Sequence, residues 1–336
     1  KLSNYKYKYH LIFLIIVLSI PSLKLISGPS IKLIESINPA TQGYLGGMGL
    51  PIIFSWFIGG LLSAGVAFVI GKICLGLRSD YLAISTLLIS GIVISVIKHE
   101  EWLSRGVKNV IGLKRPAPFE VNLQKSEWFM TLIDKIHFWA PTTKDVIISS
   151  SGIFVKLCFT IIFSITLLTL LYLSERAVNS PWGRMMRAIR DNETAAKAMG
   201  KNIVKQQLNI FMIGSAIIGF AGAMLVTYDG LFTPSSYQPL RYTFLIWVMV
   251  LLGGSGNNYG SILGAFVVWF IWIESAPIAL FIINFCTFFL EYNNPVKLHL
   301  IESVPYFRYL MMGVGLLLVM RYKPEGLLPE KKISFK

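Results

Sequence analysis

The sequence predicts an all-α membrane protein, a polytopic bundle of about eight transmembrane helices with short or re-entrant segments. Of its 336 residues, 54% are hydrophobic and only 14% are charged, whereas a soluble domain normally carries about a quarter charged residues. Several stretches are almost free of charge, as the hydrocarbon core of a bilayer requires of spanning helices. The net charge of +14 comes from basic residues that flank these stretches. This placement is typical of loops that set membrane topology and argues against a nucleic-acid-binding protein.

Eight apolar runs mark the expected spans, and a ninth run is shorter. The first of the eight follows a basic start without a cleavage-site pattern, so we expect a signal-anchor helix. The ninth, residues 276–290, has only about 15 residues, and we expect it to be re-entrant or interfacial. The eight expected spans are residues 11–26, 50–71, 80–97, 151–174, 207–228, 242–253, 259–274 and 306–322.

Basic residues in the short loops predict the orientation of the chain. Residues 175–206 carry seven Lys and Arg against three Asp and Glu, and the tail from Arg321 is also basic. Both segments should therefore be cytoplasmic. With eight spans, this places 98–150 outside and both termini on the cytoplasmic side of a bacterial inner membrane. Residues 1–336 then form a single transmembrane domain.

The outside loop 98–150 is too long for a bare connection and contains a second apolar pattern. Its aromatic and aliphatic residues recur at helical spacing, with Ser126 as an N-cap and Pro141 as a stop. We expect an amphipathic helix on the outer leaflet, which serves either as a docking surface for an external partner or as a lipid-facing anchor. The apolar residues are Trp128, Phe129, Leu132, Ile133, Ile136 and Trp139.

Small residues indicate where the helices pack closely. They recur four positions apart at Ser215, Gly219 and Ala223, a spacing that lets helix backbones approach each other in lipid. After the short run 242–253, a Gly-Gly-Ser-Gly sequence predicts a helix break within the membrane that lines protein and not lipid. The glycines that we assign to this break or to a translocation path are Gly253, Gly254, Gly256, Gly260 and Gly264.

The sequence shows no catalytic, cofactor or metal signature. The four histidines are scattered, and neither an HExxH motif nor a GxxxxGK[ST] phosphate loop is present. Residues 50–71, 80–97, 157–173, 207–228 and 243–273 contain no ionisable side chain between their flanking charges. Gradient-driven carriers commonly place such groups at mid-membrane, so we expect the energy for transport to arrive through a partner.

The cytoplasmic loop 175–206 shows where a partner could act. Arg184, Arg187 and Arg190 are three residues apart, and we expect them on a helix that extends the preceding span into water. Asn192 then suits an N-cap and Gly200 a left-handed C-terminal stop, which together bound a helix of under three turns. This helix is either an ordinary loop helix or a rod whose small apolar face sits in the groove of another protein. That face consists of Ala195, Ala196, Ala198 and Met199.

Residues 180–202 resemble the corresponding loop of LivM-type permeases of branched-chain amino acid ABC importers. Ala195, Ala196 and Gly200 match the A-A-x-x-x-G part of the coupling signature of such permeases, and Thr194 stands where Glu is frequent. Three further segments are similar to the same family, namely 78–87 (RSDYLAISTL), 250–265 (VLLGGSGNNYGSILGA) and 321–328 (RYKPEGLL).

The resemblance implies an importer with several subunits. It would combine this chain with a related second permease subunit, two cytoplasmic ATPases that hold ATP and Mg, and a periplasmic solute-binding protein, all in contact with membrane lipids. The chain itself would bind no cofactor and no nucleic acid. Ala195, Ala196 and Gly200 would form the coupling helix, supported by Glu193 and by Arg184, Arg187 and Arg190.

The resemblance also implies a class of solute. Branched-chain or other hydrophobic amino acids are expected, and urea or short amides are the alternative within related permeases. A gradient-driven carrier and an intramembrane enzyme remain as other classes. An enzyme would need clustered acids or histidines, whereas Asp229, Glu274 and Glu291 are separate in the sequence.

Overall fold

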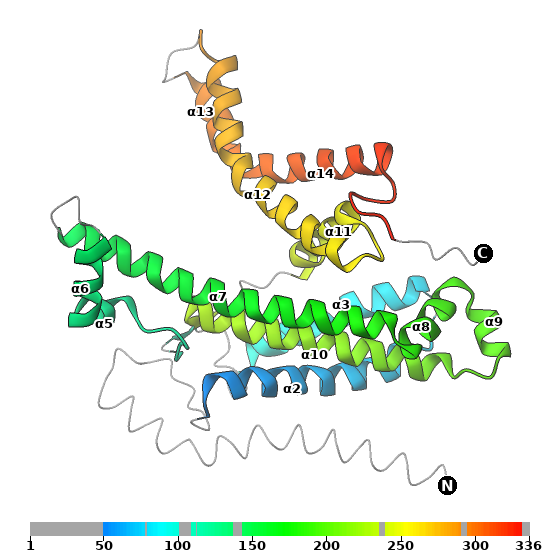
Figure 1. Ribbon diagram of the computed structural model, residues 1–336. Helices are drawn as coiled ribbons and strands as arrows, with labels where there is room; N and C mark the ends of the chain where they lie inside the picture. Colours follow the sequence, from blue (N-terminus) through cyan, green and yellow to red (C-terminus); the bar gives the residue numbers. More distant parts are fainter. Residues whose placement is uncertain are drawn as a thin grey trace. The chain divides into compact units, whose positions relative to one another are not determined.

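A computed structural model describes residues 50–77, 79–100, 109–111, 113–136, 143–234, 239–289 and 294–330. These residues form twelve helices and one two-stranded ladder (Figure 1). Their contacts divide the chain into two compact units, Lys1–Tyr237 and Gln238–Lys336. The predicted span 11–26 lies outside the described residues, as do Trp139 and Pro141.

The first unit contains eight described helices and both strands. The helices that follow the predicted spans are α2 (Ile52–Cys74), α3 (Ser79–His99), α7 (Lys144–Asn179) and α10 (Ile203–Asp229). The shorter elements are β1 (Val110–Ile111), α5 (Glu120–Gln124), α6 (Glu127–Ile136), α8 (Pro181–Asp191), α9 (Glu193–Ala198) and β2 (Leu231–Phe232).

The second unit contains four described helices. They are α11 (Pro239–Gly253), α12 (Asn258–Cys286), α13 (Pro295–Glu302) and α14 (Val304–Tyr322). Its core lies between α11, α12 and α14, and it is built on Leu245, Val248, Leu252, Val268, Trp272 and Met312.

Six helices in the described part are long and apolar enough to cross a membrane, and they coincide with six of the predicted spans. The prediction of an all-α polytopic protein is therefore confirmed. These helices are α2, α3, α7, α10, α12 and α14. The helix α11 has 15 residues and is therefore only about 22 Å long. This length is less than the hydrocarbon thickness of a bilayer, which is about 30 Å.

The expectation of a separate re-entrant segment at 276–290 is wrong. One helix, α12, continues through Pro277 to Cys286. A proline removes only one backbone donor from a helix. Transmembrane helices tolerate proline where neighbouring groups form hydrogen bonds with the carbonyl that loses its partner. The apolar residues on both sides of Pro277 stay helical, and the 29 residues of α12 extend over about 44 Å.

Close contact between α2 and α10 holds the first unit together. A Cβ atom at Gly60 would lie 2.9 Å from the carbonyl oxygen of Ala216, and one at Gly219 would collide with the Cβ of Ser63. The Ser63 hydroxyl donates a hydrogen bond to the Ser215 carbonyl at 2.8 Å. Small residues thus let the two backbones meet, as their four-residue spacing predicted.

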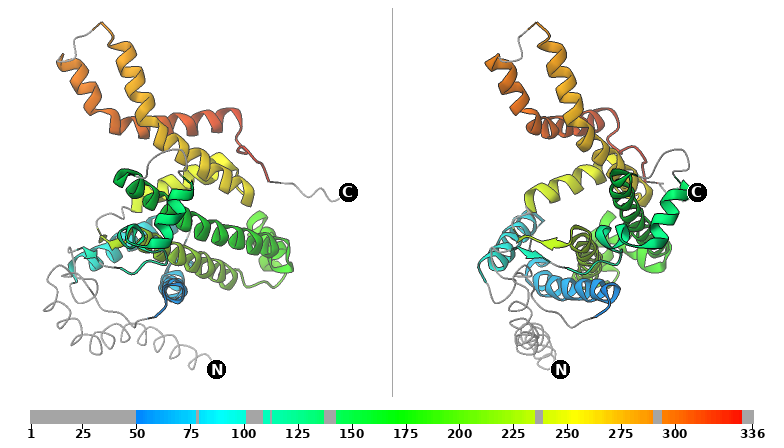
Figure 2. Two further views of the ribbon diagram at one scale, coloured as in Figure 1. Left: turned by 60° about the vertical axis from the view of Figure 1, so that its left-hand side comes forward. Right: turned by 90° about the vertical axis from the view of Figure 1, so that its left-hand side faces the viewer.

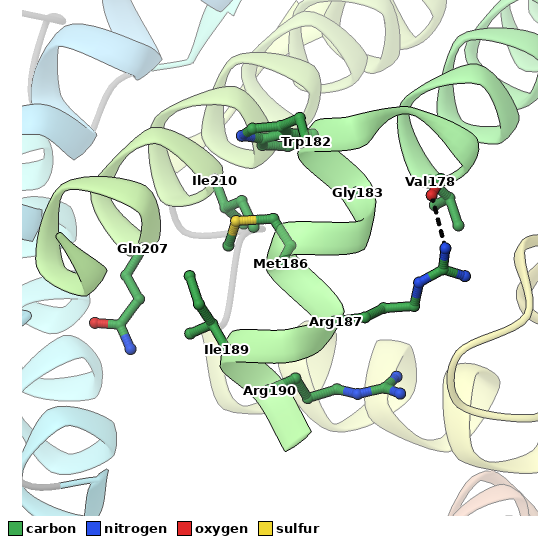
Figure 3. Close-up of a pocket in the computed structure, with 9 residues that line it drawn as sticks. All are labelled: Val178, Trp182, Gly183, Met186, Arg187, Ile189, Arg190, Gln207 and Ile210. Atoms are coloured by element: carbon green, nitrogen blue, oxygen red, sulfur yellow. Dashed lines mark hydrogen bonds between the residues drawn. The ribbon is translucent and has the colours of Figure 1, made fainter. Parts of the chain in front are cut away.

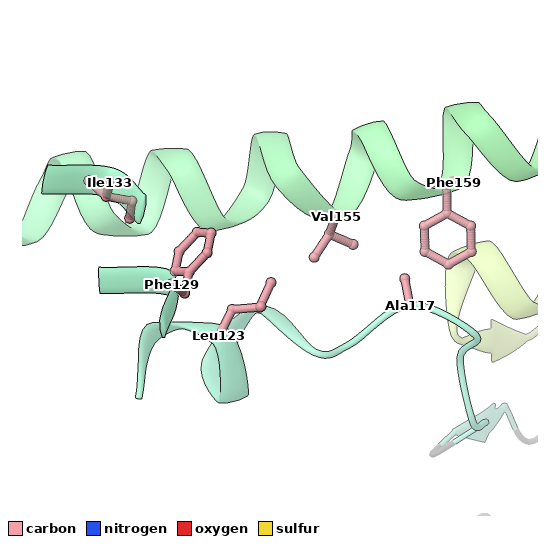
Figure 4. Packing of buried hydrophobic residues seen from close by; sticks show 6 residues of the cluster. All are labelled: Ala117, Leu123, Phe129, Ile133, Val155 and Phe159. Atoms are coloured by element: carbon pink, nitrogen blue, oxygen red, sulfur yellow. The ribbon is translucent and has the colours of Figure 1, made fainter. Parts of the chain in front are cut away.

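A compact apolar cluster surrounds the first half of α7. Phe129 and Ile133 of α6 are buried with Val155 and Phe159 of α7, and Leu123 of α5 completes the layer (Figure 4). The helix predicted between Ser126 and Pro141 is therefore confirmed over Glu127–Ile136. Two of its apolar residues point inward onto the protein, whereas Trp128 and Ile136 stay exposed.

A short ladder ties this cluster to the end of α10. β1 pairs antiparallel with β2, with Val110 opposite Phe232 (Figure 2). Beside it, Arg115 forms an ion pair of 3.5 Å with Glu120 and donates to the carbonyl of Asp229, also at 3.5 Å. Much of the described part of the predicted loop 98–150 is thus an ordered cap, and its last seven residues belong to α7.

We predict that Gly219→Leu destabilises the protein through the contact between α2 and α10. Overpacking of this kind typically costs about 1–3 kcal/mol. The measurement is the thermal unfolding midpoint of the purified protein in detergent. Gly222→Leu on the same helix is the matched control, because a Cβ there meets nothing within 4 Å. Equal midpoints for the two variants would show that the close contact does not contribute to stability.

Candidate functional site

The loop between α7 and α10 begins with a sharp corner. Ser180 leaves the helical conformation, with φ −74° and ψ 167°, and its hydroxyl accepts a hydrogen bond from the Gly183 amide at 3.2 Å. Pro181 then starts α8, a position that suits proline because the first amides of a helix have no partner. The expectation that the arginines extend the preceding span is therefore wrong, because they lie on a separate helix.

Gly183 makes this corner possible. A Cβ atom at this position would collide with the carbonyl oxygens of Ala177 and Val178. Only glycine lets the first turn of α8 lie directly against the last turn of α7. The corner therefore fixes the direction of α8 relative to the long helix that precedes it.

Two of the three predicted arginines reach back to the end of α7. Arg187 donates to the carbonyl of Val178 at 3.2 Å, and Arg184 donates to that of Asn179 at 3.3 Å. Carbonyls at a helix C-terminus have no partner within the helix and attract cations. The third, Arg190, forms an ion pair of 3.1 Å with Asp191, and both side chains are more than half exposed.

Local hydrogen bonds fix both ends of α9. Asn192 accepts a hydrogen bond from the Ala195 amide at 2.9 Å, so its predicted role as an N-cap is confirmed. Gly200 has φ +74°, its amide donates to the Lys197 carbonyl, and the Lys201 amide donates to the Ala196 carbonyl. This pair of bonds is a Schellman motif, which ends the helix at a left-handed glycine as predicted.

The two faces of α9 differ from the expected arrangement. Ala196 is buried in a small cluster with Ile189 of α8 and Ile203 of α10. It therefore anchors α9 to its own chain and does not belong to the exposed face. Ala195 and Ala198 remain exposed, and Met199 is 80% exposed. The surface that α9 offers to another protein is thus smaller than the sequence suggested.

A hollow of about 420 Å³ lies beside α8. Its floor is apolar, and the aliphatic part of Arg187 and the side chain of Arg190 extend along one edge (Figure 3). The lining comes from the end of α7, from α8 and from the start of α10, with Trp182, Met186, Ile189 and Ile210 as its larger apolar residues. The loop therefore presents an apolar hollow next to basic groups.

The glycine-rich segment of the second unit forms the predicted helix break. The helix α11 ends at Gly253, and Asn257 caps the start of α12. Between them, Gly254 has a φ of 119° and Gly256 a φ of 94°. A Cβ at Gly253 would collide with the Gly260 carbonyl, and one at Gly264 would collide with that of Met249. The segment thus separates two helices as predicted, while its place within the membrane and a role in the translocation path stay predictions.

The described end of the chain packs onto this break. The Leu327 amide donates to the Leu252 carbonyl at 3.0 Å, and the Leu328 amide donates to the Gly253 carbonyl at 2.9 Å. Carbonyls at the end of a helix need such partners. The segments 250–265 and 321–328, which resemble permeases separately, are therefore parts of one structural junction.

A second hollow lies between α2, α7 and α10 in the apolar stretch of the first unit. Its volume is about 530 Å³, and its lining is almost entirely apolar, with Trp56, Phe57 and Phe220 among the residues. The Thr166 and Thr169 hydroxyls at its wall donate to carbonyls of their own helix. This hollow accordingly offers apolar surface to an occupant.

The sequence reasoning missed one charged residue inside a span. Arg308 lies one turn into α14, and its guanidinium carbon is 5.5 Å from the centre of the Trp272 ring of α12. The signal is present in the sequence, because the predicted span 306–322 contains this arginine. A charge in a spanning segment is by default a candidate functional group.

Comparison with known proteins identifies the chain. A family model described as the permease component of branched-chain amino acid transport systems matches residues 33–320. The chain belongs to this family. It is therefore a multi-pass membrane protein and a transport subunit of a system with further components. The predicted resemblance to LivM-type permeases is confirmed.

Individual relatives agree with the family. The chain is 30% identical over 278 residues to the probable branched-chain amino acid transport permease protein LivM of Methanocaldococcus jannaschii, which covers 81% of this chain and 68% of the relative. It is 25% identical over 283 residues to the high-affinity LivM proteins of Salmonella typhimurium and Escherichia coli, and it spans only 58% of their length. No solved structure matches the chain.

We predict that Gly183→Ala loosens the corner between α7 and α8. The added Cβ must displace backbone, at a typical cost of about 1–3 kcal/mol. This cost raises the fraction of molecules in which α8 is locally unfolded about fivefold or more. Tryptic cleavage after Arg184, Arg187 and Arg190 in the purified protein should accelerate accordingly. Gly152→Ala on α7 is the control, since a Cβ there meets nothing within 4 Å. Unchanged cleavage of the Gly183 variant would contradict the assigned role of this corner.

Proposed function

We propose that this chain is the membrane-spanning permease subunit of an ABC importer for branched-chain or other hydrophobic amino acids. The single observation that carries the proposal is the family match over residues 33–320. The relatives named for branched-chain amino acid transport cover most of this chain, which supports the solute class. Urea or short amides are the alternative solutes.

We propose further that α9 and its two caps form the coupling element. ATP and Mg bind to two partner ATPases, and closure of these subunits pushes on the exposed residues of α9 as a rigid body. The caps at Asn192 and Gly200 and the buried Ala196 support this role, because a stiff element can transmit a displacement. Ala195 and Met199 form the contact surface, with Glu193 and Arg190 at its edge.

Arg184 and Arg187 have a more indirect role in this proposal. Their hydrogen bonds to Asn179 and Val178 join α8 to the end of α7. A force applied to the loop is therefore delivered to a helix of 36 residues, about 54 Å long. Such a helix is longer than the membrane is thick, so it can carry the movement to the opposite side.

The remaining subunits and the orientation complete the proposal. A related second permease subunit lies beside this chain, and a periplasmic solute-binding protein docks on the outer side. The loop containing α8 and α9, the helix break at Gly254 and both chain termini lie on the cytoplasmic side of the inner membrane. The contact between Leu327 and Leu252 supports this arrangement, because it brings the basic tail to the same end of the helices as the break.

The coupling role predicts the effect of Gly200→Leu. The left-handed conformation costs a side-chain-bearing residue about 1–2 kcal/mol, so the Schellman motif is lost and α9 no longer ends in place. In the assembled complex, leucine uptake should fall about tenfold, the change that 1.4 kcal/mol corresponds to, while the partner ATPases still hydrolyse ATP. The measurements are uptake and ATP hydrolysis in proteoliposomes.

Gly76→Leu is the matched control for this variant. Gly76 lies in the turn after α2, on the same proposed side of the membrane, and a Cβ there meets nothing within 4 Å. Uptake by this control should be normal. Affinity purification of the tagged wild-type chain should also recover an ATPase with a Walker A motif. Normal uptake by the Gly200 variant, or the absence of any ATPase, would contradict the coupling role.

The orientation can be tested by labelling single cysteines. Lys125→Cys and Lys201→Cys should react with an impermeant maleimide from opposite sides, Lys125→Cys from the periplasm and Lys201→Cys from the cytoplasm. The three native cysteines, Cys74, Cys158 and Cys286, are replaced by Ser in this background. Labelling of both positions from one side would rule out the proposed topology.

A further inference from the structure

Arg308 is partly buried and lies one turn into α14, on the side of that helix that contacts Trp272 of α12. It precedes the end of α14 at Tyr322 by about 21 Å of helix, and Trp272 follows the start of α12 at Asn258 by the same distance. With the proposed orientation, both residues lie in the outer half of a hydrocarbon layer about 30 Å thick. They are where a solute would enter from the periplasmic side.

The environment of Arg308 orients its guanidinium but leaves its Nε without an acceptor among the described residues. The guanidinium lies on the face of Trp272, a side chain that is only 7% exposed. Tyr309 packs against the same indole, with ring centres 5.7 Å apart. The Nε atom is buried, and no described residue accepts a hydrogen bond from it. Buried donors normally have a partner, so this one is available for an acceptor from outside the described chain.

We propose that Arg308 binds the carboxylate of the amino acid during its passage through the membrane. The inference rests on the proposed function as an amino acid importer. A guanidinium presents a planar fork that matches a carboxylate in a bidentate arrangement. The stacking on Trp272 holds this fork in place before the solute arrives.

The surroundings of Arg308 suit the rest of such a solute. Trp272 and Met312 belong to the apolar cluster of the second unit, and Tyr309 is half exposed beside them. A hydrophobic amino acid therefore meets one cation for its carboxylate and apolar surface for its side chain. Urea and short amides have no carboxylate, so the site favours amino acids over these alternatives.

The experiment measures how much leucine moves for each ATP hydrolysed. The complete transporter, with its ATPases and solute-binding protein, is reconstituted in proteoliposomes, and [³H]leucine uptake and ATP hydrolysis are followed together. In Arg308→Gln, leucine moved per ATP should fall at least about tenfold, since a charge-assisted hydrogen bond to the solute is lost. ATP hydrolysis stimulated by the loaded binding protein should remain within about twofold of wild type. This change is smaller than the tenfold fall expected in leucine moved per ATP, which corresponds to about 1.4 kcal/mol.

Arg321→Gln is the matched control, because this arginine lies at the other end of α14. It should leave leucine uptake per ATP unchanged. Arg308→Lys keeps the charge but loses the planar fork, so its ratio should lie between those of wild type and Arg308→Gln. If Arg308→Gln does not assemble, Arg308→Lys carries the test, and an unchanged ratio for it overturns the proposal.

Two other results would also overturn the proposal. Parallel loss of uptake and ATP hydrolysis in assembled Arg308→Gln would show a structural role. A further comparison uses vesicles of phosphatidylcholine alone and vesicles that also contain phosphatidylglycerol. Arg308 would bind a lipid phosphate if two results occur together. The wild-type complex would move more leucine per ATP when phosphatidylglycerol is present, and Arg308→Gln would not respond to this lipid. Absence of leucine uptake by the wild-type complex would instead be a failure of the proposed function.

Discussion

Close backbone contact at small residues is the constraint on which the rest of this structure depends. Lipid chains are as apolar as leucine, so helices in a membrane gain little from hydrophobic burial against each other and associate through van der Waals packing. In the first unit, Gly60 and Gly219 bring α2 against α10. In the second, Gly253 and Gly264 bring α11 against α12. The nearest neighbours of a Cβ at these glycines are backbone atoms or the Cβ of Ser63, which side-chain rotation cannot move away.

The loop between α7 and α10 is held as firmly as the helices that it joins. Each turn of the loop from Ser180 to Asn202 is held by a local hydrogen bond, and Ala196 is packed against its own chain. A loop held in this way moves as a body with the helices at its ends. The exposed part of α9 is small, so the coupling role that we propose for it depends on shape and position more than on the area buried.

Local signals in the sequence were sufficient for the caps and breaks. Asn192, Gly200 and the Gly-Gly-Ser-Gly segment act through their own backbone conformations, and all three were predicted correctly. Tertiary contacts could not be predicted in the same way. The inward direction of Phe129, the collision that makes Gly183 necessary and the burial of Ala196 all depend on residues from other elements. The continuity of α12 through Pro277 likewise depends on the apolar context, which outweighs the local preference of proline.

Arg308 is a charged residue within one of the spanning helices. Arginine at the centre of a spanning helix costs about 2.5–3.5 kcal/mol on insertion scales, and the cost is smaller for Arg308, which lies one turn from the start of α14. Stacking on an aromatic ring returns about 0.5–2 kcal/mol, so the contact of Arg308 with Trp272 offsets part of this cost. A path that is otherwise uncharged needs little more than one such group to recognise a zwitterion, because the ammonium group can be satisfied by carbonyls or water. In the role that we propose for Arg308, its buried Nε has no acceptor among the described residues and can therefore bind a carboxylate and release it again.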